Sequence, residues 1–551
     1  MAAESLRSPR KPSPWAVHIA PTAVMKKAAA IPKIFKNTMT PHSLLAASTL
    51  RWGTLSPTPI PDRGAQMSTD YTFDHFLIGG RWAKPSGKDT VEVVSPHSEE
   101  VIGRLPRATT SDIDAAVASA RAAFDSGPWP RMSPAERIAV VERFSGLYAA
   151  RLDDLAKVVS TEMGSPISFS NLAQAPAPWM QIEAFLNIAR EFPWEQARPG
   201  TLGADVVVRH EPVGVVAAIT PWNVPLFTGV AKLVPALLAG CCVVLKPALE
   251  SPLNSYLLAE LLIEAGVPEG VVSIVPGDGA IGAHLVEHPG IDKVAFTGST
   301  AVGRQIGSVC GQQLKRVSLE LGGKSAAIVL ADADLAQVVE GVKFLGVMNS
   351  GQACVAQSRI LAPKARYAEV VEAIAQGIGA MQVGDPLDPA TEIGPMVSQR
   401  QQQRVRSYIA LGQQEGAQLV TGGEDRPDGL DKGWYVRPTV FANVDNQMRI
   451  AQEEIFGPVL SVIAYDDVPD AVRIANESDY GLAGTVWTAD VDAGLEVARG
   501  VRTGTFGINT YTMDFAAPFG GFKQSGLGRE FGPEGLAAFT ELKSVYLPLP
   551  E

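Results

Sequence analysis

The fold is decided by a stretch that begins with the apolar run Val213-Gly214-Val215-Val216-Ala217-Ala218-Ile219 and ends with Lys293-Val294-Ala295-Phe296. Within it, short apolar runs alternate with longer segments of helical periodicity. We expect strands over residues 213–219, 242–245, 271–275 and 293–296, and helices through 232–238, over 253–265 and near Ile281. Strands that alternate with helices indicate βαβ units and a parallel sheet with helices on both faces. Dinucleotides bind at the carboxyl ends of such strands.

A second alternating region starts at Ala326-Ala327-Ile328-Val329-Leu330 and continues to about Glu530. It contains Cys354, so we expect it to be the catalytic region. Residues 205–209 and 541–547 look extended and belong to neither alternating region. The sequence therefore predicts an α/β protein with two doubly wound parallel sheets and additional strands outside both.

Two helices are expected before this stretch. Ser111 can cap a helix whose Asp114 reaches back, and Ser133-Pro134-Ala135-Glu136 combines a capping box with proline at the first helical position. The second helix is expected to run past Leu155 towards Gly164. Residues 171–190 also have helical character.

The chain has 551 residues, which predicts two or three domains. Residues 1–66 hold nine Lys/Arg against two acidic residues, a net charge of +7, and the remainder has a net charge of −18. An acidic body argues against nucleic acid as a partner, because phosphate binding needs a basic face. Residues 1–66 are basic and rich in proline. They resemble a mitochondrial presequence, or they precede a true start at Met67.

Four cysteines are too few for a disulfide framework, and a reducing compartment is expected. Adjacent Cys241 and Cys242 would point to opposite faces of a strand. No spacing of Cys or His suggests a metal. Lys232, Pro235 and Gly240 interrupt the longest apolar region, so no transmembrane span is expected.

Cys354 lies in Asn349-Ser350-Gly351-Gln352-Ala353-Cys354-Val355-Ala356-Gln357-Ser358-Arg359. A thiol is a strong nucleophile near neutral pH, and small neighbours leave room for a carbonyl carbon. On this stretch alone, a buried packing cysteine is the more common interpretation.

Two further segments are Ser318-Leu319-Glu320-Leu321-Gly322-Gly323-Lys324 and Thr220-Pro221-Trp222-Asn223-Val224-Pro225. Together with the cysteine segment they resemble the aldehyde dehydrogenase superfamily, and the resemblance extends from about Phe73 to Val545. It implies a Rossmann-like NAD(P)-binding domain, a catalytic domain and a β oligomerisation arm. The expected domains are 67–190 with 212–322 for the cofactor, 323–537 for catalysis, and 191–211 with 538–551 for the arm, after the extension 1–66.

The resemblance implies the cofactor site. Gly298, Ser299 and Gly303 form a strand-to-helix turn that would contact the dinucleotide phosphates, although alone it is a generic turn. Lys246, otherwise a solvated strand end, would contact the adenosine ribose. Trp222, Glu454 and Phe456 complete the set, with Glu454 on the nicotinamide ribose and Phe456 against the ring. Without this context, Glu453-Glu454 is a solvated acidic pair.

NAD is the expected cofactor, with NADP possible. Members of the superfamily that prefer NAD commonly have a glutamate three residues after the lysine, where its charge disfavours a 2′-phosphate. Here that position is Leu249, followed by Glu250.

Catalysis is assigned by the same resemblance to Cys354 as nucleophile, Glu320 as general base and Asn223 as an oxyanion donor. Lys232 and Glu530 would line the active site and its water channel. Burial would raise the pKa of Glu320 towards the operating pH. Simpler interpretations are an ion pair of Glu320 with Arg316 or Lys324, and an Asx turn at Asn223.

The implied reaction is oxidation of an aldehyde to the carboxylic acid through a thiohemiacetal and a thioester. Glu320 favours hydrolysis over transfer of the acyl group to coenzyme A. Alternatives are an acylating dehydrogenase, a thiol esterase without hydride transfer, and a member that has lost catalysis.

The substrate entrance is expected to be mostly apolar, which favours a hydrophobic or aromatic aldehyde. Arg316, Arg529 and Glu541 match a set that would join the active site to the arm, or they form ordinary surface ion pairs. A homodimer or homotetramer is expected, without nucleic acid or membrane partners. A cytoplasmic location is expected, or the mitochondrial matrix if 1–66 is a presequence. The entrance would be lined by Val224, Phe227, Thr228, Ala231, Met513 and Phe519.

Overall fold

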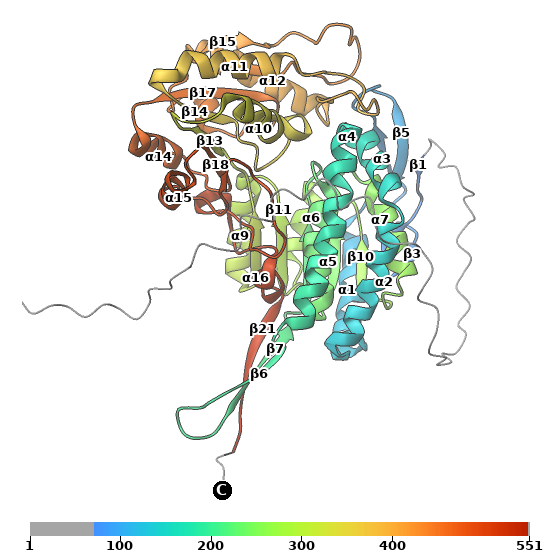
Figure 1. Cartoon of the computed structure of the whole chain (residues 1–551). Coiled ribbons are helices and arrows are strands. Elements are labelled where there is room, and N and C mark those ends of the chain that lie inside the picture. The colour runs from blue at the N-terminus through green and yellow to red at the C-terminus, as the bar shows by residue number, and fades with distance from the viewer. Residues whose placement is uncertain (1–70, 549–551) are drawn as a thin grey trace, which may run out of the picture. The chain divides into compact units, whose positions relative to one another are not determined.

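The computed structural model describes residues 71–548, so the basic extension expected at 1–66 lies outside the described residues. The described part contains two large sheets and two small ones (Figure 1). No helix in this part is long and apolar enough to cross a membrane.

The first large sheet has eight strands in the order β20-β12-β11-β8-β9-β10-β2-β3. The five central strands are parallel, and β20, β2 and β3 pair antiparallel with their neighbours. The expected alternation is confirmed here. The strands are β2 (Phe76–Ile78), β3 (Arg81–Ala83), β8 (Val215–Ile219), β9 (Cys242–Lys246), β10 (Val272–Ile274), β11 (Lys293–Thr297), β12 (Arg316–Glu320) and β20 (Gly526–Leu527).

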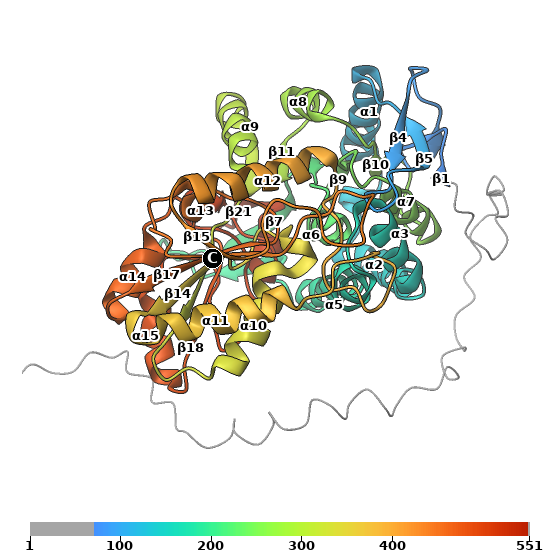
Figure 2. The same cartoon turned by 90° about the horizontal axis from the view of Figure 1, so that it is seen from above.

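Helices cover both faces of this sheet, and one apolar core joins them to it. Figure 2 shows α1, α8 and α9 on one face and α2, α5, α6 and α7 on the other. The helices of this part of the molecule, including three not named above, are α1 (Thr110–Ser126), α2 (Pro134–Ala149), α3 (Leu152–Met163), α4 (Ile167–Phe169), α5 (Pro176–Glu191), α6 (Pro225–Ala239), α7 (Leu253–Glu264), α8 (Gly279–Glu287), α9 (Thr300–Gln313) and α16 (Gly532–Ala537).

Two details of the expected helices are wrong. Thr109 precedes α1, and the Asp112 carboxylate accepts its backbone N–H at 2.8 Å, so the reciprocal pair lies two residues before the expected Ser111 and Asp114. The helix after Ser133 begins as expected with its capping box, but it ends at Ala149. Arg151 leaves helical geometry there. Its guanidinium binds the carboxylate of Asp154 in the first turn of the next helix, α3.

The second large sheet has the order β15-β16-β17-β14-β13-β18-β19, and all its strands are parallel except β15. One apolar core joins it to α10 and α11, and another joins its opposite face to α12, α13, α14 and α15. The strands are β13 (Ala326–Val329), β14 (Arg359–Pro363), β15 (Gln418–Thr421), β16 (Thr439–Ala442), β17 (Val459–Tyr465), β18 (Gly484–Trp487) and β19 (Gly507–Ile508). The helices are α10 (Leu335–Val347), α11 (Tyr367–Gly379), α12 (Gln399–Gln414), α13 (Arg449–Gln452), α14 (Val468–Asn476) and α15 (Val491–Gly500).

The strands expected outside both sheets form a sheet of their own. β21 (Thr540–Tyr546), β7 (Val206–Pro212) and β6 (Glu195–Arg198) pair antiparallel, and Figure 1 shows them extending away from the large sheets. A fourth sheet joins β1 (Tyr71–Thr72), β5 (Val101–Pro106) and β4 (Thr90–Val94).

Candidate active site

The Cys354 loop follows α10 through a strained turn. Asn349 and Ser350 both have left-handed backbone geometry, with φ of 52° and 60°. Side-chain bonds hold this turn, because the Asn349 amide donates to the Asn223 carbonyl at 2.9 Å and the Ser350 hydroxyl accepts from the Gly394 N–H at 2.9 Å. Such strain persists only where the surroundings fix it, and it concentrates at functional sites.

Gly351 belongs to the same turn, with φ of 74°. A Cβ there would collide with the backbone of Gly457, so the thiol loop packs directly on the segment that contains Glu454 and Phe456. Cys354 is partly exposed, whereas Cys241, Cys242 and Cys310 are buried. Burial and the charges of Glu454 and Glu320 raise the pKa of the Cys354 thiol to about 12.

Asn223 lies beside this loop rather than in an Asx turn. Its side-chain amide donates to the Gln352 carbonyl at 2.9 Å, two residues before Cys354. The side chain is buried, and the Gln174 side-chain amide donates to the backbone carbonyl of Asn223 at 2.9 Å. The amide of Asn223 is thereby fixed next to the thiol loop.

Glu320 ends β12 and is buried, and neither of its carboxylate oxygens has a hydrogen-bond partner. The simpler ion-pair interpretation is absent from the described residues, because Arg316 pairs with Glu541 instead and Lys324 forms no ion pair. Burial, and next the charge of Glu530, raise the pKa of Glu320 well above its usual value, while Lys232 and Arg529 oppose the shift.

Lys232 and Glu530 form a buried ion pair beside Glu320. The Lys232 ammonium contacts the Glu530 carboxylate at 2.7 Å and donates to the Thr297 hydroxyl at 2.6 Å. Both hydrogen bonds are charge-assisted, which stabilises charge away from water. The two predicted residues, Lys232 of α6 and Glu530 after β20, therefore meet here, together with Thr297 of β11, which was not predicted.

The predicted phosphate turn connects β11 to α9. Ser299 caps the helix by accepting the Val302 N–H, and the Gly298 N–H donates to the Glu320 carbonyl at 3.0 Å. A Cβ on Gly303 would lie 2.5 Å from a methyl of Leu321, so the helix start packs closely on the chain after Glu320. Backbone N–H groups at a helix start bind phosphate.

Lys246 ends β9 and is buried rather than solvated. Its ammonium donates to the Gly277 carbonyl at 2.6 Å and the Pro247 carbonyl at 3.1 Å. Burial lowers the pKa of Lys246 to about 8, and the charges of Glu250 and Asp278 oppose the shift. The half-buried Leu249 packs against the first core.

Glu454 does not form a solvated pair with Glu453. Its carboxylate accepts the Gly323 N–H at 3.0 Å, and burial raises its pKa to about 7. Glu453 instead pairs with Arg449. The Phe456 ring meets Trp222 edge to face at 5.4 Å.

The expected entrance residues adjoin an aromatic cluster. The ring of Phe227 lies 6.0 Å from Phe515 and 5.6 Å from Phe531, and the Phe519 ring lies 5.9 Å from Phe531. The Thr228 hydroxyl donates to the Val224 carbonyl at 3.0 Å, and the side chain is buried. Ala231 is buried, and Met513 packs on the same core.

Several residues of this region escaped the sequence analysis. Tyr511 is close enough to Cys354 and Glu320 for their charges to act on its hydroxyl, which also contacts the Thr505 hydroxyl at 2.7 Å. Phe515 and Phe531 complete the aromatic cluster. No motif marks these positions, although Phe515 and Tyr511 lie within a few residues of Met513.

The set expected to join the active site to the arm is only partly present. Arg316 of β12 pairs with Glu541 of β21, both largely exposed. Arg529 instead donates to the Gly528 carbonyl at 2.6 Å and lies over the Phe522 ring. Across residues 71–548 no group of three Cys, His, Asp or Glu is arranged to hold a metal ion.

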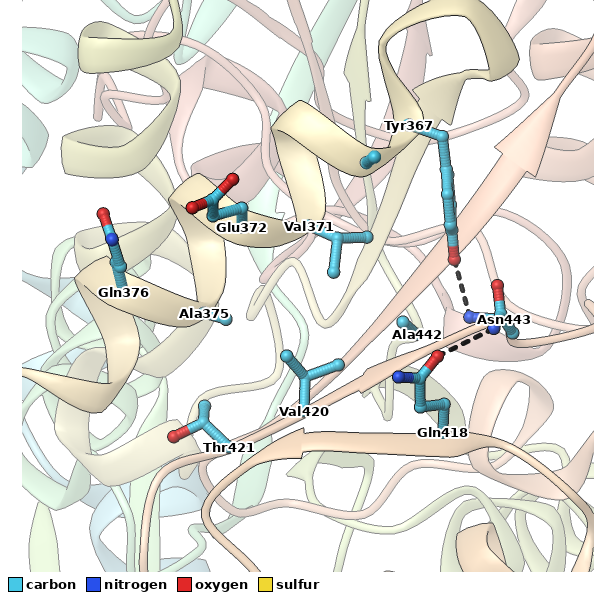
Figure 3. Close-up of a pocket in the computed structure, with 11 residues that line it drawn as sticks. Tyr367, Val371, Glu372, Ala375, Gln376, Gln418, Val420, Thr421, Ala442 and Asn443 are labelled. Carbon is cyan, nitrogen blue, oxygen red and sulfur yellow. Dashed lines mark hydrogen bonds between the residues drawn. The ribbon is translucent and has the colours of Figure 1, made fainter.

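Two wider surface grooves contain none of the predicted catalytic or cofactor residues. Figure 3 shows one of about 600 Å³ between α11 and β15, where the Tyr367 hydroxyl accepts the Asn443 N–H at 2.6 Å. Another, of about 550 Å³, runs along α5 from Trp179 to Glu191 and reaches Phe515.

Comparison with known proteins identifies the family. Residues 82–545 match the aldehyde dehydrogenase family. A geranial dehydrogenase of Castellaniella defragrans is 48% identical over 481 residues, which cover 87% of this chain and 100% of the relative. A 3-succinoylsemialdehyde-pyridine dehydrogenase of a Pseudomonas species is 43% identical, over 86% of this chain and 98% of the relative.

Solved structures agree. An aldehyde dehydrogenase of Mycobacterium tuberculosis complexed with NAD+ is 51% identical, with a TM-score of 0.86 over 88% of this chain and 99% of that one. A mutant of aldehyde dehydrogenase C from Pseudomonas syringae, complexed with NAD+ and octanal, is 40% identical with a TM-score of 0.83, over 86% and 96%. Fold and match define an oxidoreductase that acts on aldehydes. The chain belongs to the aldehyde dehydrogenase family.

Proposed function

We propose that this chain oxidises hydrophobic aldehydes to carboxylic acids with NAD, through a thioester on Cys354 that Glu320 hydrolyses. The observation that carries the proposal is the buried Glu320 carboxylate, which has no hydrogen-bond partner and lies beside the Lys232–Glu530 pair. A buried carboxylate left unpaired is costly for stability, so such a group is a candidate for catalysis.

The first step needs the thiolate of Cys354. The charge of Glu320 raises the pKa of the Cys354 thiol, so the thiolate forms more readily once Glu320 has taken up a proton. Glu320 as carboxylate takes the thiol proton, and the sulfur attacks the aldehyde carbon. The Asn223 amide and the N–H of Cys354 stabilise the oxyanion that forms, and one such donor contributes about 3–4 kcal/mol.

A nicotinamide cofactor, which the Gly298–Ser299 turn and Glu454 would hold, would supply the acceptor for the hydride. The sulfur then holds a thioester and no longer carries negative charge, so Glu320 can release the thiol proton to solvent and return to the carboxylate. Glu320 takes a proton from water, the hydroxide oxygen attacks the thioester, and the acid leaves as the thiol is restored. Lys232 stabilises the Glu320 carboxylate through its charge.

The residues at the ends of β9 and β11 suit a dinucleotide. The Gly298–Ser299 turn offers N–H groups at the start of α9 for the phosphates, and Glu454 lies across the site for the ribose of the nicotinamide. Near Lys246, the Asp278 carboxylate already accepts the Ala280 and Ile281 N–H groups at the start of α8. Leu249 carries no charge, but Asp278 and Glu250 place negative charge near Lys246. This charge disfavours the 2′-phosphate of NADP.

A hydrophobic substrate is supported by the aromatic cluster around Phe227 and by the groove that reaches Phe515. Two relatives support a hydrophobic substrate as well. One is a geranial dehydrogenase, and the other was crystallised with octanal. We also propose the division into a cofactor domain (67–190 and 212–322), a catalytic domain (323–537) and an oligomerisation arm (191–211 and 538–551) of a homodimer or homotetramer. Four free thiols favour the cytoplasm.

The test follows absorbance of the reduced nicotinamide with purified protein. Octanal, geranial and benzaldehyde would be offered with NAD and NADP separately, and Cys354→Ala would serve as the inactive control. We expect turnover that needs Cys354, prefers NAD and releases the free acid. An acyl-coenzyme A product on addition of coenzyme A would instead support acyl transfer. Failure of cofactor binding would refute the proposal.

A further inference from the structure

The backbone carbonyl of Asn223 lies just outside a helix and needs hydrogen-bond donors from elsewhere. α6 begins at Pro225, and the first carbonyl that this helix binds is that of Val224, which accepts the Thr228 N–H at 3.0 Å. The Asn223 carbonyl precedes it, and Asn223 is buried. A buried carbonyl without donors would destabilise this segment, so its partners matter for the position of Asn223.

Two side-chain amides supply those donors. The Gln174 amide and the Asn349 amide each donate to the Asn223 carbonyl at 2.9 Å. Both side chains are buried. They come from different parts of the chain, since Asn349 lies in the thiol loop and Gln174 precedes α5. The peptide group after Asn223 is thus tied both to the loop of the proposed nucleophile and to a separate element.

Gln174 ends a single turn of π-helix, Ser170–Gln174, between α4 and α5. The Ala175 N–H donates to the Ser170 carbonyl at 3.1 Å, a bond that spans five residues instead of four. Pro176 follows directly and has no N–H with which to continue an α-helical pattern. Single π-turns are rare and are frequent at functional sites. This turn ends with the Gln174 side chain on the carbonyl of Asn223.

The side chain of Asn223 is oriented by a further contact to the thiol loop. Its amide nitrogen donates to the Gln352 carbonyl at 2.9 Å. A carbonyl accepts and cannot donate, so this contact turns the nitrogen of the amide, and not its oxygen, towards the loop. An amide nitrogen has two N–H groups, and within residues 71–548 this one binds no second acceptor. One N–H therefore remains for the oxyanion of the proposed reaction.

We propose that Gln174 is a positioning residue for the oxyanion donor Asn223, an inference that rests on the proposed function. Gln174 acts through the backbone from which the Asn223 side chain projects, and not on the reacting atoms. A donor stabilises an oxyanion most when its position is fixed before the charge develops. Asn349 moves with the thiol loop, whereas Gln174 anchors the same carbonyl from an independent element.

A second buried glutamine provides a matched control. Gln181 lies on α5 and is fully buried, and neither atom of its amide has a hydrogen-bond partner among the described residues. Gln181→Met therefore removes a buried amide a short way along the chain from Gln174 without removing a contact to Asn223. Gln174→Met removes the same chemical group together with that contact.

The test is a double-mutant cycle on the rate of the first turnover. Octanal is mixed rapidly with an excess of the full-length enzyme and saturating NAD, and absorbance of the reduced nicotinamide is followed. Gln174→Met is expected to slow this turnover by about tenfold. In the Asn223→Ala background the same change should alter the rate by less than about twofold, because the side chain that Gln174 positions is gone. Gln181→Met should leave the rate unchanged in both backgrounds.

The outcomes separate this inference from the proposed function. Equal slowing by Gln174→Met in both backgrounds would show a purely structural effect and would overturn the inference. A slow Asn223→Ala variant beside a Gln174→Met variant of natural rate would overturn the inference alone. A natural rate in Asn223→Ala would remove the oxyanion assignment itself.

Gln174→Glu replaces Gln174→Met if that variant does not fold. A protonated carboxyl group can donate to the Asn223 carbonyl, whereas a carboxylate cannot donate and repels it. The rate of this variant relative to the natural chain should therefore fall as the pH rises, and the fall should be absent in the Asn223→Ala background. A ratio that stays constant with pH would contradict the assignment.

Discussion

The charge of Glu320 raises the pKa of the Cys354 thiol, so the protonation of Glu320 bears on the order of the proposed steps. Lys232 and Glu530 act on Glu320 with opposite signs, because one lowers its pKa and the other raises it. The charges of Glu320, Lys232 and Glu530 and the thiol of Cys354 thus together determine which group holds the proton. The behaviour of each can be tested separately.

Glu320→Gln is expected to slow hydrolysis of the thioester by about 100-fold or more, since it removes the proposed general base. The acyl-enzyme should then accumulate and appear as added mass on the intact protein. Glu162→Gln is a suitable control, because Glu162 is also buried but caps α7 through Leu253 and Asn254. Full turnover in the Glu320 variant would show that another group activates water.

The pH dependence of thioester hydrolysis should respond in opposite directions to two changes. Glu320 is active as carboxylate, so hydrolysis rises as the pH passes its elevated pKa. Lys232→Met removes a charge that lowers this pKa and should move the rise to higher pH. Glu530→Gln removes a charge that raises it and should move the rise to lower pH. Decay of the acyl-enzyme after rapid mixing measures both, and shifts in the same direction would reject the assignment.

At the scale of elements, the close approach of α9 to the chain after β12 shapes the turn that we propose binds the cofactor phosphates. Gly303→Ala places a methyl 2.5 Å from Leu321 and is expected to destabilise the protein by about 1–3 kcal/mol and to weaken cofactor binding. Gly307→Ala, one turn later, meets only an ordinary contact at 3.7 Å and should be neutral or stabilising. Thermal unfolding and cofactor titration compare the two, and equal losses would contradict the packing argument.

The alternation of apolar runs and helical periods was enough to locate β8, β9, β10 and β11 within about two residues. Hydrophobic periodicity is local, and these strands are buried on both faces, so nothing competes with it. The break at Arg151 was not predicted, because the apolar pattern continues through it and only the bond to Asp154 fixes the new helix start.

The sequence motifs predicted which residues form the candidate site, but not which partners their side chains have. The sequence named Glu320 and Lys232, yet only the fold shows that Arg316 is occupied by Glu541 and leaves the carboxylate unpaired. The left-handed turn at Asn349 and Ser350 is also invisible in sequence, since contacts to Asn223 and Gly394, far along the chain, hold it.

At the scale of the whole molecule, the sheet of β6, β7 and β21 presents apolar side chains to solvent. Leu542 exposes 63% and Tyr546 80% of its surface. If this arm joins subunits, Leu542→Glu should shift the assembly towards smaller species in analytical ultracentrifugation, because it places a charge in an apolar contact. Leu387→Glu, a change at another exposed leucine outside the arm, should leave the mass unchanged. An unchanged mass in both would move the interface elsewhere.

The chain leaves the first large sheet after β12 and returns to it at β20. These two points are adjacent, because Glu320 and Gly526 are register partners in β12 and β20. Residues 321–525 therefore form an inserted segment, here called the cassette. Its two ends lie side by side in the first large sheet, which is the host sheet. Recombination between related genes could exchange this cassette without disturbing the host sheet. The proposed nucleophile Cys354 lies in the cassette and the proposed general base Glu320 lies outside it, so a chimera is expected to inherit acylation from one parent and hydrolysis from the other.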